Sequence, residues 1–205
     1  SFPRGAPESS PDARPFAYAD AIRLRGAHNV GNVQAAALAA ERIGAPREAI
    51  HGAIAAFHGV PHRLEMVREL DGVTWVNDSA STAPVAGIAA LASFTAPVVL
   101  IAGGNSKQLD ASDYASAAAR CKRVVLLAGN ASDDFAARVR AACAAQGRAD
   151  CVVGPFDNLG VAVGVARAAA APGDVVLLSP GFTSFGMFLH EFDRGDRFRA
   201  LVQAL

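Results

Sequence analysis

The sequence lacks an excess of either charge, and it lacks any long apolar run. Its 205 residues carry 19 Lys plus Arg and 19 Asp plus Glu, so the formal net charge is zero. Balanced charge gives no support for nucleic acid or a membrane surface as the main partner. No apolar stretch reaches the roughly 20 residues that span a bilayer. Residues 1–5 have no apolar export signal core. We therefore expect a cytoplasmic protein with neither kind of partner.

Cysteine is scarce, and its spacing matches no metal site. Cys121, Cys143 and Cys151 are odd in number and fit no zinc pattern, so three reduced thiols are expected. His51 and His58 have no ligand partners at metal-binding spacing, so no metal site is expected in this chain. Apolar residues make up 52% of the sequence, which is enough for a substantial core.

Several catalytic signatures are also missing. Residues 103–107, Gly-Gly-Asn-Ser-Lys, have neither the order of a Walker A loop nor the spacing of a GxGxxG fingerprint. Residues 180–185 do not form a GxSxG nucleophile elbow, and no Ser-His-Asp set is suggested by spacing. NAD binding and nucleophilic catalysis therefore have little support, and no catalytic residue is assigned to this chain.

The first 60 residues contain too few elements for a domain of their own. Residues 1–16 form an irregular tail, and residues 19–24 could form a short strand. Asn29 is the expected cap of a helix that runs to about residue 43, and a second helix follows Pro46 with Ile50, Ile54 and Phe57 on its core face. Gly59-Val60-Pro61 is the expected boundary, so we predict a division into residues 1–60 and 61–205.

The remainder alternates between strand and helix patterns. Residues 64–70 and 73–76 flank Asp71-Gly72, a hairpin turn signal. Further strands are expected at 98–102, 124–128, 151–153 and 175–179, and helices at 84–93, 111–120, 133–146, 159–170, 182–190 and 193–205. Because the central strands are continuously apolar, the sheet should be covered on both faces. The predicted fold is α/β: a Rossmann-like, doubly wound, mostly parallel sheet with an N-terminal hairpin, preceded by a helical remnant of a second domain.

Three polar or Gly-rich segments, residues 78–82, 103–107 and 179–184, each follow a predicted strand. The carboxyl ends of parallel strands lie at one edge of a sheet, where open α/β folds bind ligands, so these loops should converge. The segment around Asp78 and Thr82 also precedes a helix, whose free N–H groups suit an anion. The alternative for these polar residues is simple helix capping.

Single residues leave alternatives open. Lys107, one of two lysines, could hold a ligand or could be solvated. Asn29 and Asn32 lie three apart on one helix face and could read an adenine edge, or be a cap and an exposed Asn. Arg63 could clamp a phosphate, or could pair with a nearby Glu.

Taken together, the motifs resemble the Mur ligase family, ATP-dependent enzymes that add amino acids to a UDP-muramoyl peptide precursor of peptidoglycan. The order and separation of the strings are most like the family's D-glutamate-adding members. The strings begin at about Leu24 and extend to the C-terminal part of the chain: Leu24-Arg25-Gly26-Ala27-His28-Asn29 with Asn32, residues 59–65, Asn77-Asp78-Ser79, Gly103-Gly104 with Lys107, Leu178-Ser179-Pro180 with Ser184-Phe185, and residues 194–198.

The resemblance implies that residues 1–60 end a central ATPase domain and that 61–205 form a C-terminal glutamate-binding domain. The N-terminal domain and most of the central domain would be missing, so the chain alone should be inactive. The whole enzyme would use ATP and Mg²⁺ to join glutamate to UDP-N-acetylmuramoyl-L-alanine. By resemblance, Asn29, Asn32, Arg63 and Asp78 would contact ATP, and Thr82, Lys107, Ser184 and the backbone of Phe185 would hold glutamate.

Two positions depart from the family pattern. Ala80 stands where many D-glutamate ligases have Lys, and Gly186 stands where Asp is usual. An L-glutamate-adding ligase of the same family is therefore an alternative. A second alternative, from another functional class, is a stand-alone nucleotide- or amino-acid-binding module without ligase activity.

Overall fold

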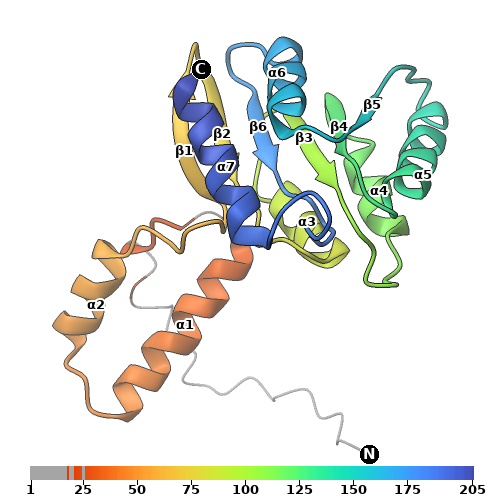
Figure 1. Cartoon of the computed structure of the whole chain (residues 1–205). Helices are drawn as coiled ribbons and strands as arrows, with labels where there is room; N and C mark the ends of the chain where they lie inside the picture. Colours follow the sequence, from red (N-terminus) through yellow and green to blue (C-terminus); the bar gives the residue numbers. More distant parts are fainter. Residues whose placement is uncertain (1–17, 19–20, 25) are drawn as a thin grey trace, which may run out of the picture. The chain divides into compact units, whose positions relative to one another are not determined.

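The computed structural model describes residues 18, 21–24 and 26–205, and it contains two compact units, Ser1–His58 and Gly59–Leu205 (Figure 1). The first unit contains helices α1 (Ala27–Arg42) and α2 (Arg47–Ala56). Tyr18, Ala37 and Ile50 form its small buried cluster. Leu38 and Ile43 of this unit are 61% and 87% exposed. The two helices thus bury few apolar side chains of their own.

The second unit is built on one six-stranded sheet in the order β1-β2-β6-β3-β4-β5. Strands β1 and β2 form an antiparallel hairpin, and all the other neighbouring strands are parallel. Asp71 and Gly72 both have positive φ, 53° and 75°, which a tight hairpin turn with right-handed strand twist requires. The strands are β1 (Glu65–Leu70), β2 (Val73–Asn77), β3 (Val98–Gly103), β4 (Arg123–Leu127), β5 (Val152–Phe156) and β6 (Val175–Leu178).

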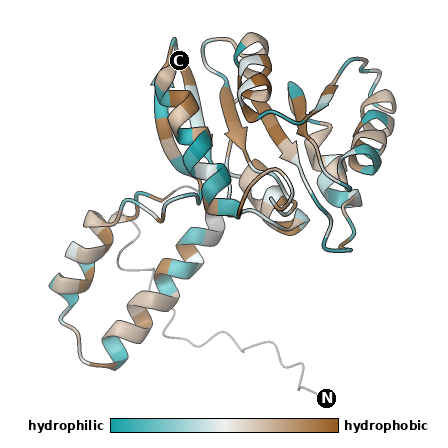
Figure 2. Ribbon diagram, viewed as in Figure 1, coloured by the Kyte–Doolittle hydropathy of each residue, from teal (hydrophilic) through white to brown (hydrophobic). Residues whose placement is uncertain are grey.

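Helices cover both faces of this sheet. One core cluster joins side chains of β3 and β4 to residues of α3, α4 and α5, and the other joins the alternate side chains of the same strands to α6 and α7. The central strands β3 and β6 are therefore buried throughout, and they are brown, meaning apolar, in Figure 2. The helices are α3 (Pro84–Leu91), α4 (Ser112–Ala118), α5 (Ser132–Ala144), α6 (Leu159–Ala169) and α7 (Glu191–Ala204). The predicted α/β, doubly wound, mostly parallel fold is confirmed.

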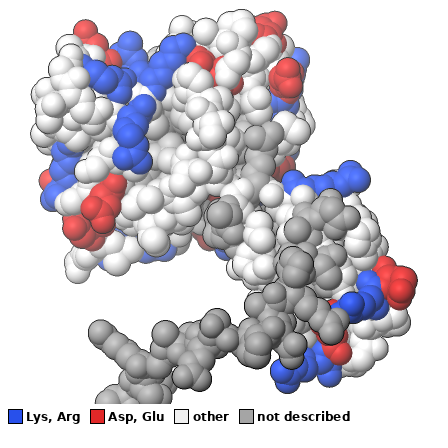
Figure 3. Space-filling model, turned by 180° about the vertical axis from the view of Figure 1, so that it is seen from behind, with Lys and Arg blue, Asp and Glu red and all other residues white. Residues whose placement is uncertain are grey.

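The balanced charge of the sequence is also visible on the surface. In the view of Figure 3, basic and acidic side chains both occur, several of them side by side, and uncharged surface lies between these groups. No described helix is both long enough and apolar enough to cross a membrane.

Three expectations for the first unit were wrong. Helix α1 begins at Ala27, so Gly26 is its N-cap and Asn29 lies inside the first turn. Residues 19 and 20 lie outside the described residues, and 21–24 form no strand. Instead, the Ala21 N–H donates to the Tyr18 carbonyl in a turn. Phe57, expected on the core face of α2, is 44% exposed.

The expected helix over residues 182–190 is also wrong. This segment is irregular, and Thr183 forms an isolated antiparallel bridge with Asn105. Gly186 has a φ of 102°, which a right-handed helix does not contain. The backbone of this segment therefore pairs with a neighbouring loop, and only at Glu191 does α7 begin.

The expectation of three reduced thiols is corrected as well. Cys143, near the end of α5, and Cys151, just before β5, are joined in a disulfide, and only Cys121 among the described cysteines is free. The two Cα atoms lie 6.7 Å apart across the connection between α5 and β5.

Candidate functional site

The three loops that follow β2, β3 and β6 meet at one edge of the sheet. Strand β6 lies between β2 and β3, and all three are parallel, so their carboxyl ends are adjacent. The loops are also hydrogen-bonded to one another: Gly181 N–H donates to the Ser81 carbonyl, and Asn105 and Thr183 exchange backbone bonds. A side chain at Gly104 would overlap the Thr183 carbonyl, so the close approach of these loops requires glycine there. The predicted convergence is confirmed.

Asp78 lies at the start of the first of these loops and is 7% exposed. Its Oδ1 accepts from the Leu64 backbone N–H at 3.1 Å, and its Oδ2 accepts from the Ser179 hydroxyl at 2.8 Å. Burial raises the pKa of Asp78 to about 6, although these hydrogen bonds and the nearby positive charge of Arg63 oppose the shift. A carboxylate oxygen can accept more than one hydrogen bond. The oxygens of Asp78 can therefore still accept a hydrogen bond from a ligand hydroxyl.

Thr82 and Lys107 come together across two loops. Lys107 Nζ donates to Thr82 Oγ1 at 2.9 Å, and Lys107 forms no ion pair with a carboxylate in the described part of the chain. Helix α3 begins just beyond Thr82, with Ala83 as N-cap and without any side-chain capping bond. The alternative interpretation, that the polar residues of this loop merely cap the helix, is therefore wrong. The ammonium group and the start of α3 together favour an anion.

Ser184 and Phe185 lie in the loop after β6. Ser184 is 4% exposed, and its buried hydroxyl has no hydrogen-bond partner within the described residues. A buried hydroxyl without a partner costs free energy, and a ligand that reaches it could supply the missing hydrogen bond. The side chain of Phe185 is 61% exposed, and its carbonyl accepts from Asn105 Nδ2 at 2.5 Å.

Asn105 is a residue of this edge that the motifs did not single out. Besides its bond to Phe185, its Oδ1 accepts from the Asn130 N–H at 2.8 Å. Asn105 thereby links the loops after β3, β4 and β6. In the sequence Asn105 simply follows Gly104, and nothing in that position indicates that its side chain links three loops.

Arg63 is exposed and forms neither an ion pair nor a side-chain hydrogen bond in the part of the chain that is described. The expected alternative, pairing of Arg63 with Glu65 or Glu69, is wrong, because neither ion pair occurs among the described residues and Glu65 pairs with Arg199. Arg63 is near enough to Asp78 to lower the pKa of that carboxyl, against the larger effect of burial. The structure therefore brings an available cation to the buried carboxylate.

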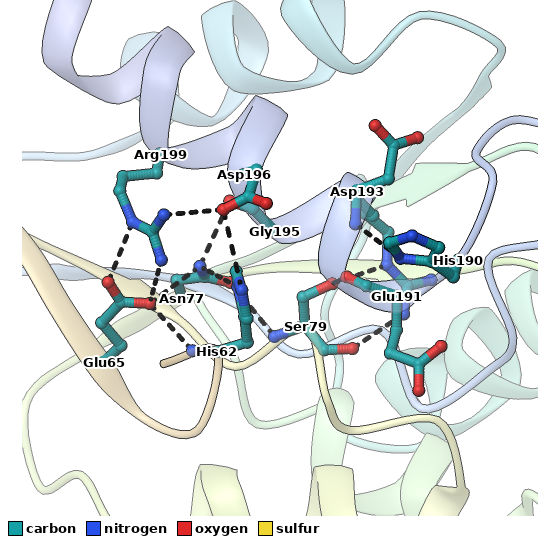
Figure 4. Close-up of polar contacts among 11 residues, drawn as sticks. His62, Glu65, Asn77, Ser79, His190, Glu191, Asp193, Gly195, Asp196 and Arg199 are labelled. Carbon is teal, nitrogen blue, oxygen red and sulfur yellow. Dashed lines mark hydrogen bonds and ion pairs between the residues drawn. The ribbon is translucent and has the colours of Figure 1, made fainter. Parts of the chain in front are cut away.

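A buried polar network surrounds this corner of the edge (Figure 4). His62 is 6% exposed, and its Nδ1 lies 3.0 Å from Asn77 Nδ2. Asn77 Nδ2 also donates to Glu65 Oε2 and to the Gly195 carbonyl, both at 3.2 Å. Arg194 is fully buried and donates to Ser79. The sequence strings that carried the resemblance include all of these residues, but their spacing did not reveal that they touch.

Asn29 and Asn32 belong to the first unit. They lie on one face of α1, where Asn32 Nδ2 donates to Asn29 Oδ1 at 3.4 Å. The described residues contain no group of three or more His, Cys, Asp or Glu side chains that could hold a metal ion.

Comparison with known proteins identifies the family. Residues 62–182, more than half of the chain, match the family model described as "Mur ligase, glutamate ligase domain". The chain belongs to the Mur ligase family. The family resemblance found in the sequence motifs is thus confirmed.

Curated relatives resemble nearly the whole of this Mur ligase chain. A UDP-N-acetylmuramoylalanine–D-glutamate ligase of Roseiflexus sp. (strain RS-1) is 51% identical over 186 residues, which are 90% of this chain and 39% of the relative. An enzyme of the same name from Symbiobacterium thermophilum is 42% identical over 93% of this chain and 41% of the relative. The chain therefore spans about two fifths of the length of these relatives.

Solved structures share the fold at much lower identity. The UDP-N-acetylmuramate-alanine ligase MurC of Thermotoga maritima gives a TM-score of 0.64 at 17% identity, covering 89% of this chain and 39% of that one. A folylpolyglutamate synthase of Mycobacterium tuberculosis, complexed with ADP and AMPPCP, gives 0.62 at 21% identity, covering 86% and 41%. At such identities the likeness establishes the fold alone.

Proposed function

We propose that this Mur ligase chain is part of an ATP-dependent ligase that adds D-glutamate to UDP-N-acetylmuramoyl-L-alanine. Residues 1–60 would be the end of a central ATPase domain, and residues 61–205 the glutamate-binding domain. The names of the relatives and the share of their length that the chain spans support this proposal. The exposed apolar side chains of Leu38 and Ile43 also suit a unit that belongs to a larger domain. The isolated chain would lack ligase activity.

The observation that carries the proposal is the pairing of Lys107 with Thr82. The ammonium group of Lys107 is held between two loops, beside a helix N-terminus, and it has no carboxylate partner among the described residues. It therefore offers a charge-assisted bond to one carboxylate of glutamate. The unpartnered Ser184 hydroxyl and the backbone of Phe185 would hold the other end of the amino acid. The Ser184 hydroxyl is buried, so it would reach glutamate only when its loop moves as the substrate binds.

The nucleotide would lie on the other side of the same edge. Arg63 would bind the phosphates of ATP, Asp78 would accept from the ribose hydroxyls, and Asn29 and Asn32 would face the adenine. ATP would supply the phosphoryl group that activates the carboxylate of UDP-N-acetylmuramoyl-L-alanine, and Mg²⁺ would accompany it on residues outside this chain. The contribution of this chain would be to bring the glutamate amine in line with the activated carbonyl, where it attacks as phosphate leaves. Because these substrates occur inside cells, we place the enzyme in the cytoplasm.

Replacement of Lys107 tests this assignment in the full-length protein. Lys107→Ala should raise the KM for glutamate about 10- to 100-fold, because a charge-assisted hydrogen bond contributes about 1.5–3 kcal/mol. The matched control is Lys122→Ala. It removes the only other lysine of the chain, which pairs with Asp174 at the opposite edge of the sheet. Equal glutamate KM values for the two variants would refute the role of Lys107.

The same assay, run with each enantiomer, decides between D- and L-glutamate. Two departures from the family pattern keep L-glutamate as the second candidate: Ala80 brings no cation, and Gly186 stands where Asp is usual. Preferential amide formation with L-glutamate would assign the enzyme to that alternative. If the full-length protein forms no amide with either enantiomer, the ligase proposal fails and a binding module remains.

A further inference from the structure

The turn that carries Arg63 has an unusual backbone. His62 and Leu64, on either side of Arg63, have φ values of 65° and 46°. A positive φ costs conformational free energy for residues other than glycine, and it persists only where surrounding contacts stabilise it. The turn lies close to the start of the second unit, directly before β1. Something must therefore hold it.

Four hydrogen bonds hold the main chain of this turn, one of them from the Arg63 N–H to the Val60 carbonyl at 3.2 Å. Leu64 N–H donates to Asp78 Oδ1 at 3.1 Å, and Ala80 N–H donates to the His62 carbonyl at 3.0 Å. His62 N–H donates to Glu65 Oε2 at 2.8 Å. Glu65 is thus the side chain that closes the turn upon itself.

Glu65 is in turn held by Arg199 from helix α7, 134 residues away in the sequence (Figure 4). Arg199 Nε lies 2.9 Å from Glu65 Oε1, and Nη2 lies 3.0 Å from Oε2, so the pair is bidentate. A third nitrogen, Nη1, donates to Asp196 at 2.7 Å and fixes the guanidinium plane. Burial alone would raise the pKa of Glu65, but the bonds from Arg199 and from the His62 N–H hold it below its usual value.

We propose that Glu65 and Arg199 are positioning residues, which fix the turn His62–Leu64 and so aim Arg63 at the nucleotide phosphates. This inference rests on the nucleotide role given to Arg63 under the proposed function. The bidentate geometry is essential, because a single flexible contact would not set the orientation of the carboxylate that binds the His62 N–H. Helix α7, the last element of the fold, thereby acts on a nucleotide contact near the start of the unit.

The test uses the full-length ligase and compares the KM for ATP with the KM for glutamate. Arg199→Ala should raise the KM for ATP about 10-fold or more, because small misplacements of a binding group have large effects. The KM for glutamate should change less than twofold. Arg199→Lys keeps the charge but cannot form the bidentate pair, so it should recover only part of the loss. Arg197→Ala is the control, since Arg197 lies on the same helix, pairs with Asp193 and does not touch the turn.

A double variant separates the two assignments. If Arg199 acts through Arg63, Arg63→Ala raises the KM for ATP, and adding Arg199→Ala to it causes no further increase. If Arg63→Ala leaves the KM for ATP unchanged, the nucleotide role of Arg63 is refuted and this inference falls with it. If Arg63→Ala raises that KM but Arg199→Ala does not, or adds an independent increase, only the positioning inference is overturned.

Hydrogen exchange of this chain gives a readout that needs no ligand. In Arg199→Ala, the His62 amide should exchange at least about 10-fold faster, because its acceptor is no longer held, while amides of β3 keep their protection. Unchanged exchange at His62 would show that Glu65 holds the turn without Arg199 and would overturn the inference.

Discussion

The guanidinium of Arg194 holds Ser79 at two points, through Nε to the hydroxyl and through Nη2 to the carbonyl, each at 2.9 Å. Its Nη1 also donates to the Phe182 carbonyl at 3.3 Å. Arg194 therefore ties α7 to the loops after β2 and β6. Burial lowers the pKa of Arg194 to about 10, which still leaves the guanidinium charged at neutral pH. Residues 194–198 carry part of the family resemblance, and Arg194 among them holds the loops of the site in place.

Loss of the Arg194 side chain should lower the stability of the chain. We expect Arg194→Ala to lower the free energy of unfolding by about 3 kcal/mol, because buried acceptors lose a charged donor. Arg197→Ala, three residues further along α7, removes an i,i+4 pair with Asp193 and a cation–π contact with Phe188, and should cost about 1 kcal/mol or less. Urea unfolding of the two variants measures the difference. Equal urea midpoints for the two variants would contradict the proposal that Arg194 holds these loops together.

The sequence could predict those parts of the fold that local pattern decides. The Asp71-Gly72 turn and the continuously apolar β3 and β6 follow from residues near one another in the chain. The convergence of the three loops follows from the rule that parallel strands have their carboxyl ends at one edge of the sheet. The contacts of Glu65 could not be predicted in this way, because its partner Arg199 is 134 residues distant. The same limit explains the error over residues 182–190, whose local pattern suits a helix but whose backbone pairs with the loop of Asn105.

Two of the helical glycines, Gly195 and Gly164, should respond oppositely to replacement by alanine. Nothing lies within 4 Å of a Cβ placed at Gly164 of α6, so Gly164→Ala should stabilise the chain by about 0.5–1 kcal/mol through helix propensity. A Cβ at Gly195 of α7 would overlap Nδ1 of the buried His62, whose ring centroid lies 5.4 Å from that of Phe192. Gly195→Ala should therefore destabilise by about 1–3 kcal/mol despite its better propensity.

Thermal or urea unfolding of the two alanine variants checks these signs. A cycle with His62→Ala identifies the cause, because removal of the ring should abolish most of the cost of Gly195→Ala. If Gly195→Ala were stabilising, like Gly164→Ala, then His62 and α7 could move apart without loss of stability. A cost at Gly195 that persists in the His62→Ala background would place the clash elsewhere.

Asp78 should make the stability of the chain depend on pH in a defined window. Its folded-state pKa, about 6, lies above the ordinary pKa of 3.8 for this carboxyl group, so the folded chain holds this proton more tightly than the unfolded chain does. The resulting stabilisation is fully present below about pH 4 and is lost as the pH rises through about 6. A pKa difference of about two units corresponds to roughly 3 kcal/mol.

Asp78→Asn isolates this contribution, because asparagine has nearly the same shape and does not titrate. Its Oδ1 can still accept from the Leu64 N–H, so the turn before β1 should persist. Urea unfolding at about pH 4 and about pH 7 should show the parent chain losing about 2–3 kcal/mol relative to the variant between the two conditions, while groups common to both chains cancel. A difference that stays constant with pH would mean that Asp78 ionises normally. In that case its carboxylate must be better solvated, or better paired with Arg63, than its 7% exposure indicates.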